Sequence, residues 1–246
     1  MADSKLAEAM GAVSLGPLLN TPEAVASVVT RLLEDKADVA VDCEGHDLCR
    51  NGTIDLLQLS NGCSTWLVDV ATLGDKAFEA GRLRELLESE TVLKVVFDGR
   101  ADADALFHLY KTRLCNAYDL QIASCRRQDH IQGRRDRFLH GLGRAMGVYL
   151  ERNPKRARRL MLVKEAGLKL FAPEKGGRYE VWAERPLAEA LVTYASADVD
   201  LLLEMKSAWE RHSPVEVNTA MTALRLRRAM DGSNPAKGKH MALKDF

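Results

Sequence analysis

Four acidic residues and a tyrosine, spread over more than half of the chain, are the residues best suited to chemistry in this sequence. Asp42 and Glu44 are two apart at the end of an apolar run, so on a β-strand both carboxylates face the same side. Asp102 lies where a strand is expected to run into a helix, and Tyr194 and Asp198 are four apart on an expected helix. Carboxylates are rarely buried without a partner, and a shared cation is one natural partner.

Each of these elements has an ordinary explanation when it is taken alone. Two acids at a strand end can simply be solvated, and an acid in the first turn of a helix is favoured by the helix dipole. Asp98 and Asp104 also compete with Asp102 for any functional role. The functional signal is therefore the combination of the elements and their order along the chain.

Apolar periodicity and turn signals predict the elements that position these residues. A helix with a Thr cap and a Pro at its first position begins at Thr21-Pro22. The hairpin signal Asn61-Gly62 separates two strands, so the first three strands are expected to form an antiparallel meander. A long helix over Glu189–Trp209 is expected to end the domain. The expected strands are 39–44, 53–60, 65–69, 93–97 and 114–118, with helices at 82–87 and 102–110. This order predicts an α/β fold, a mixed five-stranded sheet flanked by helices.

Length and composition are those of a globular protein. With 246 residues, 46% of them hydrophobic, the chain can bury the core of a single domain. We expect an N-terminal arm or short helix over 1–19, the domain over 20–212, and a tail over 213–246 that is rich in charges. No apolar run approaches the ~20 residues that span a bilayer, and no secretory leader is recognisable. The chain is therefore expected to be soluble and intracellular, with no membrane partner.

The five cysteines are odd in number, widely spaced and without a C-x-x-C pair. They predict neither a disulfide scaffold nor a zinc knuckle, and are typical of a reduced cytoplasmic or nuclear protein. Charge is balanced overall, with 35 basic and 35 acidic residues, but residues 126–159 hold eleven Lys or Arg against three acids. That basic stretch could lie against phosphates, or could be a solvated helical surface.

The acidic motifs, in their order and spacing, resemble those of the DEDDy-type 3′–5′ exonucleases. This branch of the DnaQ-like, ribonuclease H-like superfamily includes ribonuclease D, Werner-type exonuclease domains and eukaryotic 3′–5′ exonuclease-domain proteins. The resemblance covers roughly residues 20–212. Phe97 departs from it, since many relatives carry His there, and no second, helical nucleic-acid-binding domain follows. The motifs that carry the resemblance are Asp42-x-Glu44, Asp98-Gly-Arg-x-Asp102, Asp119-Leu-Gln121, Trp182-x-x-Arg-Pro-Leu187 and Tyr194-x-x-x-Asp198.

The resemblance implies a ribonuclease H-like fold and a metal-dependent exonuclease acting on the single-stranded 3′ end of RNA or DNA, with RNA slightly favoured. The expected products are nucleoside 5′-monophosphates. It also implies two divalent ions, Mg²⁺ or Mn²⁺: Asp42 would bridge them, Glu44 and Asp198 would hold one, and Asp102 the other. Tyr194 would orient the attacking water.

Three further residues are candidates for substrate binding. Gly45 and His46 directly follow the first acids and are expected to line the pocket for the terminal nucleotide. Arg100 could contact phosphate or could pair with an acid. Two rival functions stay open: a module on the same fold that holds RNA or a protein without cutting, and an enzyme for short oligonucleotides or tRNA ends. The presence of all four acids favours the nuclease.

Overall fold

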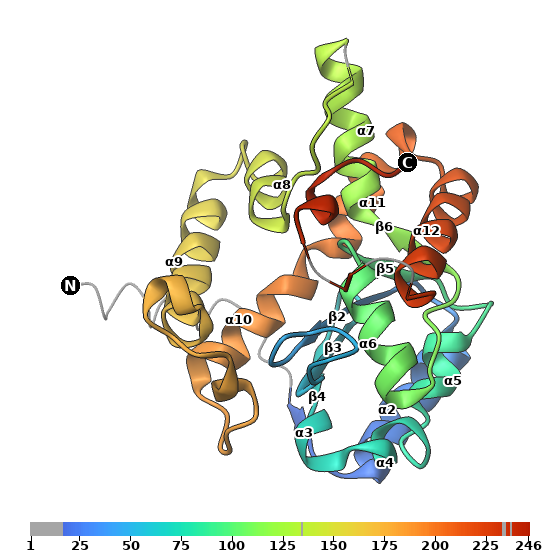
Figure 1. Cartoon of the computed structure of the whole chain (residues 1–246), viewed down its shortest axis with the longest axis vertical. Helices are drawn as coiled ribbons and strands as arrows, with labels where there is room; N and C mark the ends of the chain where they lie inside the picture. Colours follow the sequence, from blue (N-terminus) through green and yellow to red (C-terminus); the bar gives the residue numbers. More distant parts are fainter. Residues whose placement is uncertain (1–16, 134, 233–234, 237) are drawn as a thin grey trace.

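A mixed six-stranded sheet with helices on both faces forms the centre of the computed structural model of this chain (Figure 1). The structure describes residues 17–133, 135–232, 235, 236 and 238–246. The strand order is β1-β4-β3-β2-β5-β6, with β2 antiparallel to β3 and parallel to β5. The strands are β1 (Leu18–Leu19), β2 (Val39–Glu44), β3 (Leu56–Ser60), β4 (Thr65–Val68), β5 (Lys94–Val96) and β6 (Ala117–Asp119).

The predicted antiparallel meander of β2, β3 and β4 is confirmed, but the sheet has one strand more than expected. The additional strand, β1, lies in the segment expected to be an arm and pairs in parallel with β4, with Leu18 opposite Leu67. Asp69 N–H donates to the Leu19 carbonyl at 2.9 Å, which helps to close the free edge of β4. Two residues are too few to show an alternating pattern. The rest of the expected arm, residues 1–16, lies outside the described residues.

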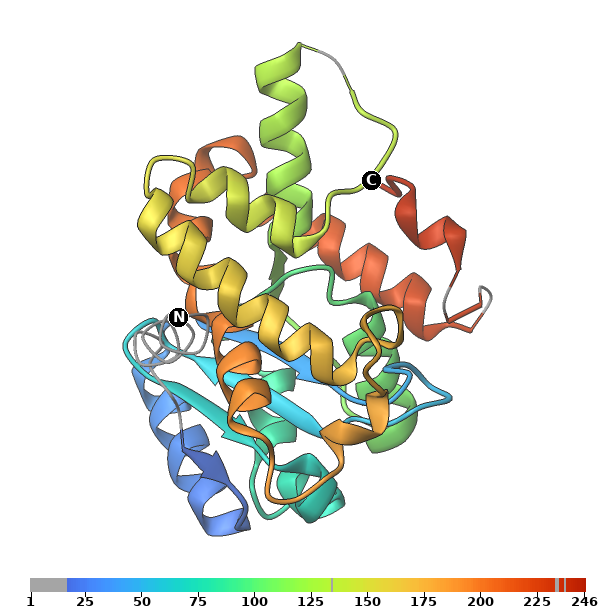
Figure 2. The same cartoon turned by 90° about the vertical axis from the view of Figure 1, so that its left-hand side faces the viewer.

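Helices cover the two faces because successive strand residues point to opposite sides. Val39, Val41 and Cys43 of β2 face α2, α5 and α6, whereas Ala40 belongs to the apolar cluster with α7, α8 and α11. Over β3 and β4, α10 packs on the sheet, and α9 lies across α10 (Figure 2). The helices are α2 (Pro22–Asp35), α3 (Val70–Leu73), α4 (Asp75–Phe78), α5 (Leu83–Glu88), α6 (Arg100–Tyr110), α7 (Leu120–Gln132), α8 (Leu142–Tyr149), α9 (Pro154–Phe171), α10 (Glu189–Asp200), α11 (Leu202–Trp209) and α12 (Val215–Met230), with 3₁₀ turns η1 (Pro173–Lys175), η2 (Tyr179–Trp182), η3 (Glu210–His212) and η4 (Lys239–Ala242).

Two expectations for the C-terminal part are corrected. The single helix expected over Glu189–Trp209 is interrupted at Leu201, which separates α10 from α11. The segment expected to be a tail contains α12, which packs against α6 and β6. Its buried face includes Asn218, Thr222 and Arg225, so a search for an apolar stripe overlooks it. Among the described residues, none of the helices combines the length and hydropathy needed to cross a bilayer.

Candidate active site

Three carboxylates meet at the carboxyl end of β2. Asp42 and Glu44 come from β2, and Asp198 comes from α10, which packs on β2. Each contributes an oxygen, and these oxygens all lie within 4.8 Å of one another. The i, i+2 spacing on the strand places both strand acids on the α10 side, as the sequence predicts. Together with Asp102, described next, we call these residues the acidic site.

Asp102 lies in the first turn of α6, where the helix dipole favours an acid. Its side chain is buried, it lies against the Cys43 thiol, and its Oδ1 has no hydrogen-bond partner. The two competing acids are engaged elsewhere: Asp98 pairs with Arg100 at 2.5 Å, and Asp104 pairs with Arg50 at 2.7 Å. Of these three acids, Asp102 is therefore the one to which the described residues give no arginine partner.

Burial raises the pKa values of all four carboxylates, and repulsion within the site adds to the rise for Asp42 and Glu44. Burial, followed by repulsion from the other three acids, raises the pKa of Asp42 well above its ordinary value. Burial and then the charge of Asp198 raise the pKa of Glu44, and burial raises the pKa of Asp102 to about 7. Burial also raises the pKa of Asp198. A cluster of this kind needs added positive charge before all of its members can ionise.

Tyr194 is held firmly beside the acids. Its ring packs edge-on against Phe171, with 5.0 Å between centroids, and lies 6.1 Å from the ring of Trp182. A Cβ added to Gly167 of α9 would lie 2.7 Å from the Tyr194 Cβ, so glycine permits this close packing. Burial, and then the charges of Asp198, Glu44 and Asp42, raise the pKa of Tyr194. The phenol therefore stays protonated and can donate a hydrogen bond.

Lys164 of α9 is a site residue that the motifs did not reveal. Its ammonium group donates to Asp198 Oδ1 and lies 3.5 Å from the centroid of the Tyr194 ring. The charge of Lys164 acts to lower the pKa values of Asp42, Glu44 and Asp198, against the effect of burial. A signal was present in the sequence, because Lys164 shares a helical face with Gly167 and Phe171, which are both buried.

The residues expected to bind substrate differ in their surroundings. A Cβ on Gly45 would collide with the backbone of Thr53, so this glycine closes the loop between β2 and β3. His46 is exposed at the same loop, and its Nε2 lies 3.9 Å from Glu180. Arg100 is buried, pairs with Asp98 and donates to the Met241 carbonyl at 2.8 Å. Of the two alternatives for Arg100, the structure shows the acid pair.

The supporting motifs act through the scaffold. Arg185 donates through two nitrogens to Asp69 and also to the Trp182 carbonyl, so the segment before α10 is tied to the end of β4. Asp119 accepts hydrogen bonds from the backbone of Asp98 at 2.9 Å and from Arg225 of α12. Both contacts fix the elements that carry the acids.

The basic stretch over 126–159 serves several purposes. Arg156 pairs with Glu204 at 2.8 Å, and Arg127 lies over the Trp209 ring. Arg126 and Arg135 line a pocket beside α7. Part of the stretch is therefore neutralised within the fold, and part faces a cavity.

The acidic site fits divalent cations. Hard carboxylate oxygens are the ligands that Mg²⁺ and Mn²⁺ prefer, and three of them converge within 4.8 Å. Asp102 lies outside this group of three, but its charge acts on Asp42 and its Oδ1 has no hydrogen-bond partner. Burial is the main cause of the raised pKa values, and a bound cation would offset both this burial and the repulsion around Asp42 and Glu44.

The sequence matches the 3′–5′ exonuclease family over residues 18–144, which is more than half of the chain and includes Asp42, Glu44 and Asp102. The chain belongs to this family. The resemblance stated from the acidic motifs is thereby confirmed, although Lys164, Tyr194 and Asp198 of this exonuclease domain lie beyond the matched residues.

Curated relatives and solved structures agree with this assignment. The chain is 29% identical over 174 residues to the piRNA biogenesis protein EXD1 of Mus musculus, covering 71% of the chain and 29% of that protein. It thus spans less than a third of this relative's length. The ribonuclease D of Trypanosoma brucei in complex with GMP has a TM-score of 0.72 at 20% identity, covering 98% of this chain and 71% of that one. The same enzyme in complex with RNA U12 has a TM-score of 0.71 at 21% identity, covering 99% and 80%. The ribonuclease H-like fold is therefore shared.

Proposed function

We propose that this exonuclease domain hydrolyses phosphodiester bonds from the 3′ end of single-stranded nucleic acid and releases nucleoside 5′-monophosphates. The observation that carries this proposal is the convergence of the Asp42, Glu44 and Asp198 oxygens within 4.8 Å, in a cluster whose charge calls for cations. Two divalent ions, Mg²⁺ or Mn²⁺, would be held by these three residues and Asp102. When bound, they would supply an activated water and stabilise charge on the departing oxygen.

The side chains around the acids divide the remaining work. Tyr194, kept protonated by its surroundings, donates a hydrogen bond that orients the attacking water. Its ring is locked by Phe171 and Trp182, so little ordering is needed when substrate binds. Lys164 places a positive charge beside Asp198, where it can contact the negative charge of the scissile phosphate.

RNA is the favoured substrate within this proposal. The support is indirect: a structural neighbour is a ribonuclease seen with RNA, and the curated relative is named for piRNA biogenesis. His46 is exposed beside the acids and Gly45 shapes its loop, so we assign these two residues to the pocket of the terminal nucleotide. Arg100, which is buried in its acid pair, is assigned to the scaffold.

The test is cleavage of 5′-labelled single-stranded RNA and DNA of matched sequence, with Mn²⁺, with Mg²⁺ and with chelator. We expect a metal-dependent ladder that shortens from the 3′ end, is stronger for RNA, and disappears in Asp42→Asn. Asp75→Asn, which changes an exposed acid on α4, is the matched control and should cleave normally. A ladder that persists in Asp42→Asn would refute the assigned site.

One observation favours a second function, a nucleic-acid-binding module that does not cut. Lys164 already neutralises part of the acidic site, as a protein side chain would in a site that holds no metal. Calorimetric titration with Mn²⁺ separates the two functions. The nuclease requires Mn²⁺ binding, with affinity raised a few-fold in Lys164→Met and unchanged in Lys169→Met, which alters an exposed lysine of the same helix. Binding of RNA without any binding of Mn²⁺ would support the module instead.

A further inference from the structure

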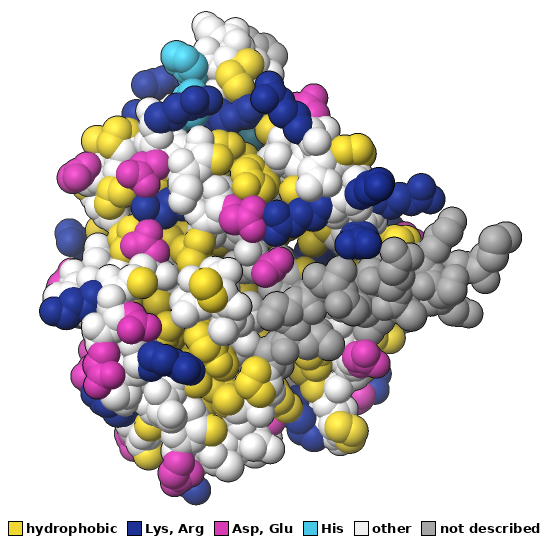
Figure 3. All heavy atoms as spheres, turned by 180° about the vertical axis from the view of Figure 1, so that it is seen from behind, with side chains coloured by type: hydrophobic (Ala, Val, Ile, Leu, Met, Phe, Trp, Pro, Cys, Tyr) yellow, Lys and Arg dark blue, Asp and Glu magenta, His cyan; other side chains and the backbone are white. Residues whose placement is uncertain are grey.

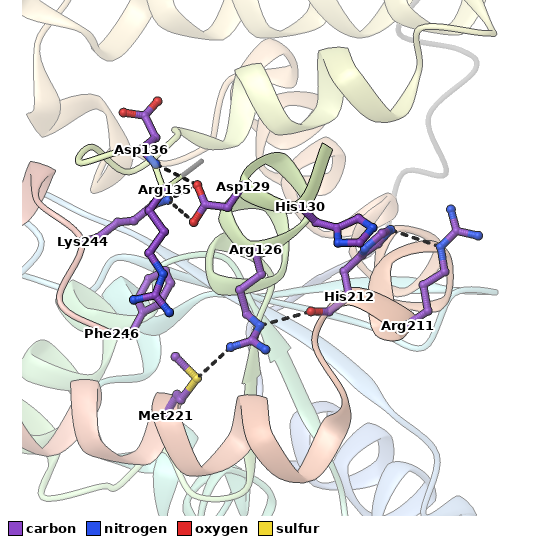
Figure 4. Close-up of a pocket in the computed structure, with 10 residues that line it drawn as sticks. All are labelled: Arg126, Asp129, His130, Arg135, Asp136, Arg211, His212, Met221, Lys244 and Phe246. Atoms are coloured by element: carbon purple, nitrogen blue, oxygen red, sulfur yellow. Dashed lines mark hydrogen bonds and ion pairs between the residues drawn. The ribbon is translucent and has the colours of Figure 1, made fainter. Parts of the chain in front are cut away.

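A cavity whose charge is opposite in sign to that of the acidic site lies beside α7. Its volume is about 910 Å³, within the range of ordinary ligand pockets. Four segments form its walls: the C-terminal half of α7 with the residues after it, η3, α12, and the end of the described chain (Figure 4). We call it the basic pocket. Its lining residues are Arg126, Asp129, His130, Arg135, Asp136, Arg211, His212, Met221, Lys244 and Phe246.

Positive charge in the basic pocket exceeds the acids that could neutralise it. Lys244 is paired with Asp129 at 2.7 Å. Among the described residues, the guanidinium groups of Arg126, Arg135 and Arg211 have no carboxylate partner. Arg126 donates only to the His212 carbonyl at 3.1 Å and to the Met221 sulfur at 3.8 Å. Three guanidinium groups around this cavity are therefore available to bind an anionic ligand.

Two histidine rings lie side by side in the basic pocket. The rings of His130 and His212 are 5.3 Å apart, and Arg211 donates to His212 Nε2 at 3.1 Å. Burial, and then the charges of Arg211, His130 and Arg127, lower the pKa of His212. Seen from behind, basic side chains and histidines form a band across the top of the molecule, where α7 lies (Figure 3). An anion entering the pocket would meet a positive field.

The chemistry of the walls selects among anions. Arginine forks match the oxygens of a phosphoryl group, and Figure 4 shows Arg126 and Arg135 both extending toward α12. Phe246 and Met221 add apolar surface beside them, and the two imidazole rings add flat faces. Phosphate-binding arginines next to surfaces on which a base can stack are the elements of nucleotide recognition. A phosphoserine side chain would use only the arginines.

We propose that the basic pocket binds a phosphorylated nucleotide, either free or at the 5′ end of an oligonucleotide. This site shares no residue with the acidic site and goes beyond the proposed cleavage. A 5′-phosphate is chemically distinct from the 3′ hydroxyl end on which an exonuclease of this family acts. The chain would thus hold separate sites for the two ends of a strand, or for a strand and a nucleotide.

The test compares two short single-stranded RNA probes that carry fluorescein at the 3′ end and differ only in a 5′-phosphate or a 5′-hydroxyl. Fluorescence anisotropy is measured in chelator, so that no cleavage occurs. We expect the 5′-phosphate to strengthen binding about tenfold, the effect of one charge-assisted contact. Arg135→Glu/Arg211→Glu should abolish this difference. Lys76→Glu/Arg113→Glu, the same charge change at exposed positions outside the basic pocket, should preserve it.

Competition identifies the source of the nucleotide. Displacement of the phosphorylated probe by uridine monophosphate assigns the pocket to free nucleotides, and displacement only by 5′-phosphorylated oligonucleotides assigns it to strand ends. Equal binding of the two probes would overturn the proposal. So would tighter binding of a phosphoserine peptide than of the nucleotide, or an equal loss in both double variants. Circular dichroism of each variant establishes that it is folded.

Discussion

The acidic site and the basic pocket are both clusters of like charge, but the chain compensates them to different extents. In the acidic site, four carboxylates share one nearby ammonium group, that of Lys164, and burial followed by mutual repulsion raises the pKa values of Asp42 and Glu44 despite that charge. In the basic pocket, one of the lysine and arginine side chains, Lys244, is paired with an acid, and three arginines keep their full charge toward solvent.

The difference lies in where each charge is placed. Carboxylates can avoid the free-energy cost of burial by taking up protons. The acidic site can therefore exist without a bound cation if some of its carboxylates stay protonated. Arginine cannot lose its proton in a protein, so the guanidinium groups of the basic pocket stay at least partly solvated. The acidic site is therefore suited to small cations, whereas the basic pocket is suited to a larger anion.

The largest expected effect is on the rate of RNA cleavage, which should depend on the acidic site and not on the basic pocket. Asp42→Asn should reduce cleavage of RNA by about a thousandfold, because loss of a carboxylate that would hold the metal ions removes several kcal/mol of transition-state stabilisation. Arg135→Glu/Arg211→Glu should leave cleavage of a 5′-hydroxyl RNA within about twofold of wild type. Initial rates at saturating Mn²⁺ measure both. Equal losses in the two variants would show that the basic pocket takes part in cleavage and is not a separate site.

Tyr194→Phe should have the next largest effect on cleavage. Removal of the hydroxyl takes away the donor that orients water but leaves the carboxylates in place, so we expect kcat to fall about 10- to 100-fold with unchanged affinity for Mn²⁺. The Mn²⁺ titration of the same variant serves as the internal reference. A fall in Mn²⁺ affinity as large as that of Asp42→Asn would contradict the role assigned to Tyr194.

Gly167→Ala tests whether α9 positions the acidic site. The added methyl group would meet the Tyr194 ring and force α9 and α10 apart, so we expect a loss of about 1–3 kcal/mol in the free energy of unfolding, and slower cleavage. Gly147→Ala in α8 is the matched control. Its Cβ meets no atom within 4 Å, so helix propensity should make it neutral or slightly stabilising. Chemical denaturation measures the free energy of unfolding of both variants. Equal values would show that α9 can shift to accommodate the methyl group without loss of stability.

The smallest expected effect is the pH dependence of stability. The raised pKa values of Asp42, Glu44 and Asp102 mean that the folded state holds protons that the unfolded state has already released. In chelator, the melting temperature should therefore fall as the pH rises from about 4, the unfolded value, through about 7, the value for Asp102. Asp42→Asn should flatten this slope, and Mn²⁺ should reverse it. A melting temperature that rises over the same interval in chelator would contradict the repulsion inferred for the acidic site.

The sequence predicted the meander of β2, β3 and β4 and the shared face of Asp42 and Glu44 because each depended on local patterns. The meeting of these two acids with Asp198 was implied by the family resemblance. Period-two apolar strands, the Asn61-Gly62 hairpin and the i, i+2 spacing of Asp42 and Glu44 are all readable within a few residues. The two-residue strand β1 and the helix α12 were not readable in this way. The first is too short for a period, and the second buries polar groups such as Asn218 that bond to β6.

The site residues that the sequence did not reveal depend on contacts between segments far apart in the chain. Lys164 is one lysine among many until α9 is laid over α10, and Arg100 is ambiguous until Asp98 and Met241 are placed beside it. Part of the basic pocket was indicated by the excess of basic residues over 126–159 in the sequence, which includes Arg126 and Arg135. Its other half comes from η3 and from Lys244, which lie far along the chain.

The hydrogen bonds of Arg225 determine which recombinant fragments of this protein can keep the fold stable. Arg225 of α12 is the counter-ion of Asp119, a fully buried carboxylate at the end of β6, and it also donates to Gln121 at 2.9 Å. A recombinant fragment that stops at residue 212, where the family motifs end, would leave Asp119 buried without its partner. An uncompensated charge of this kind costs about 3–5 kcal/mol, a large share of the stability of an ordinary domain. Expression of the exonuclease fold should therefore include α12, although no motif of the family lies in it.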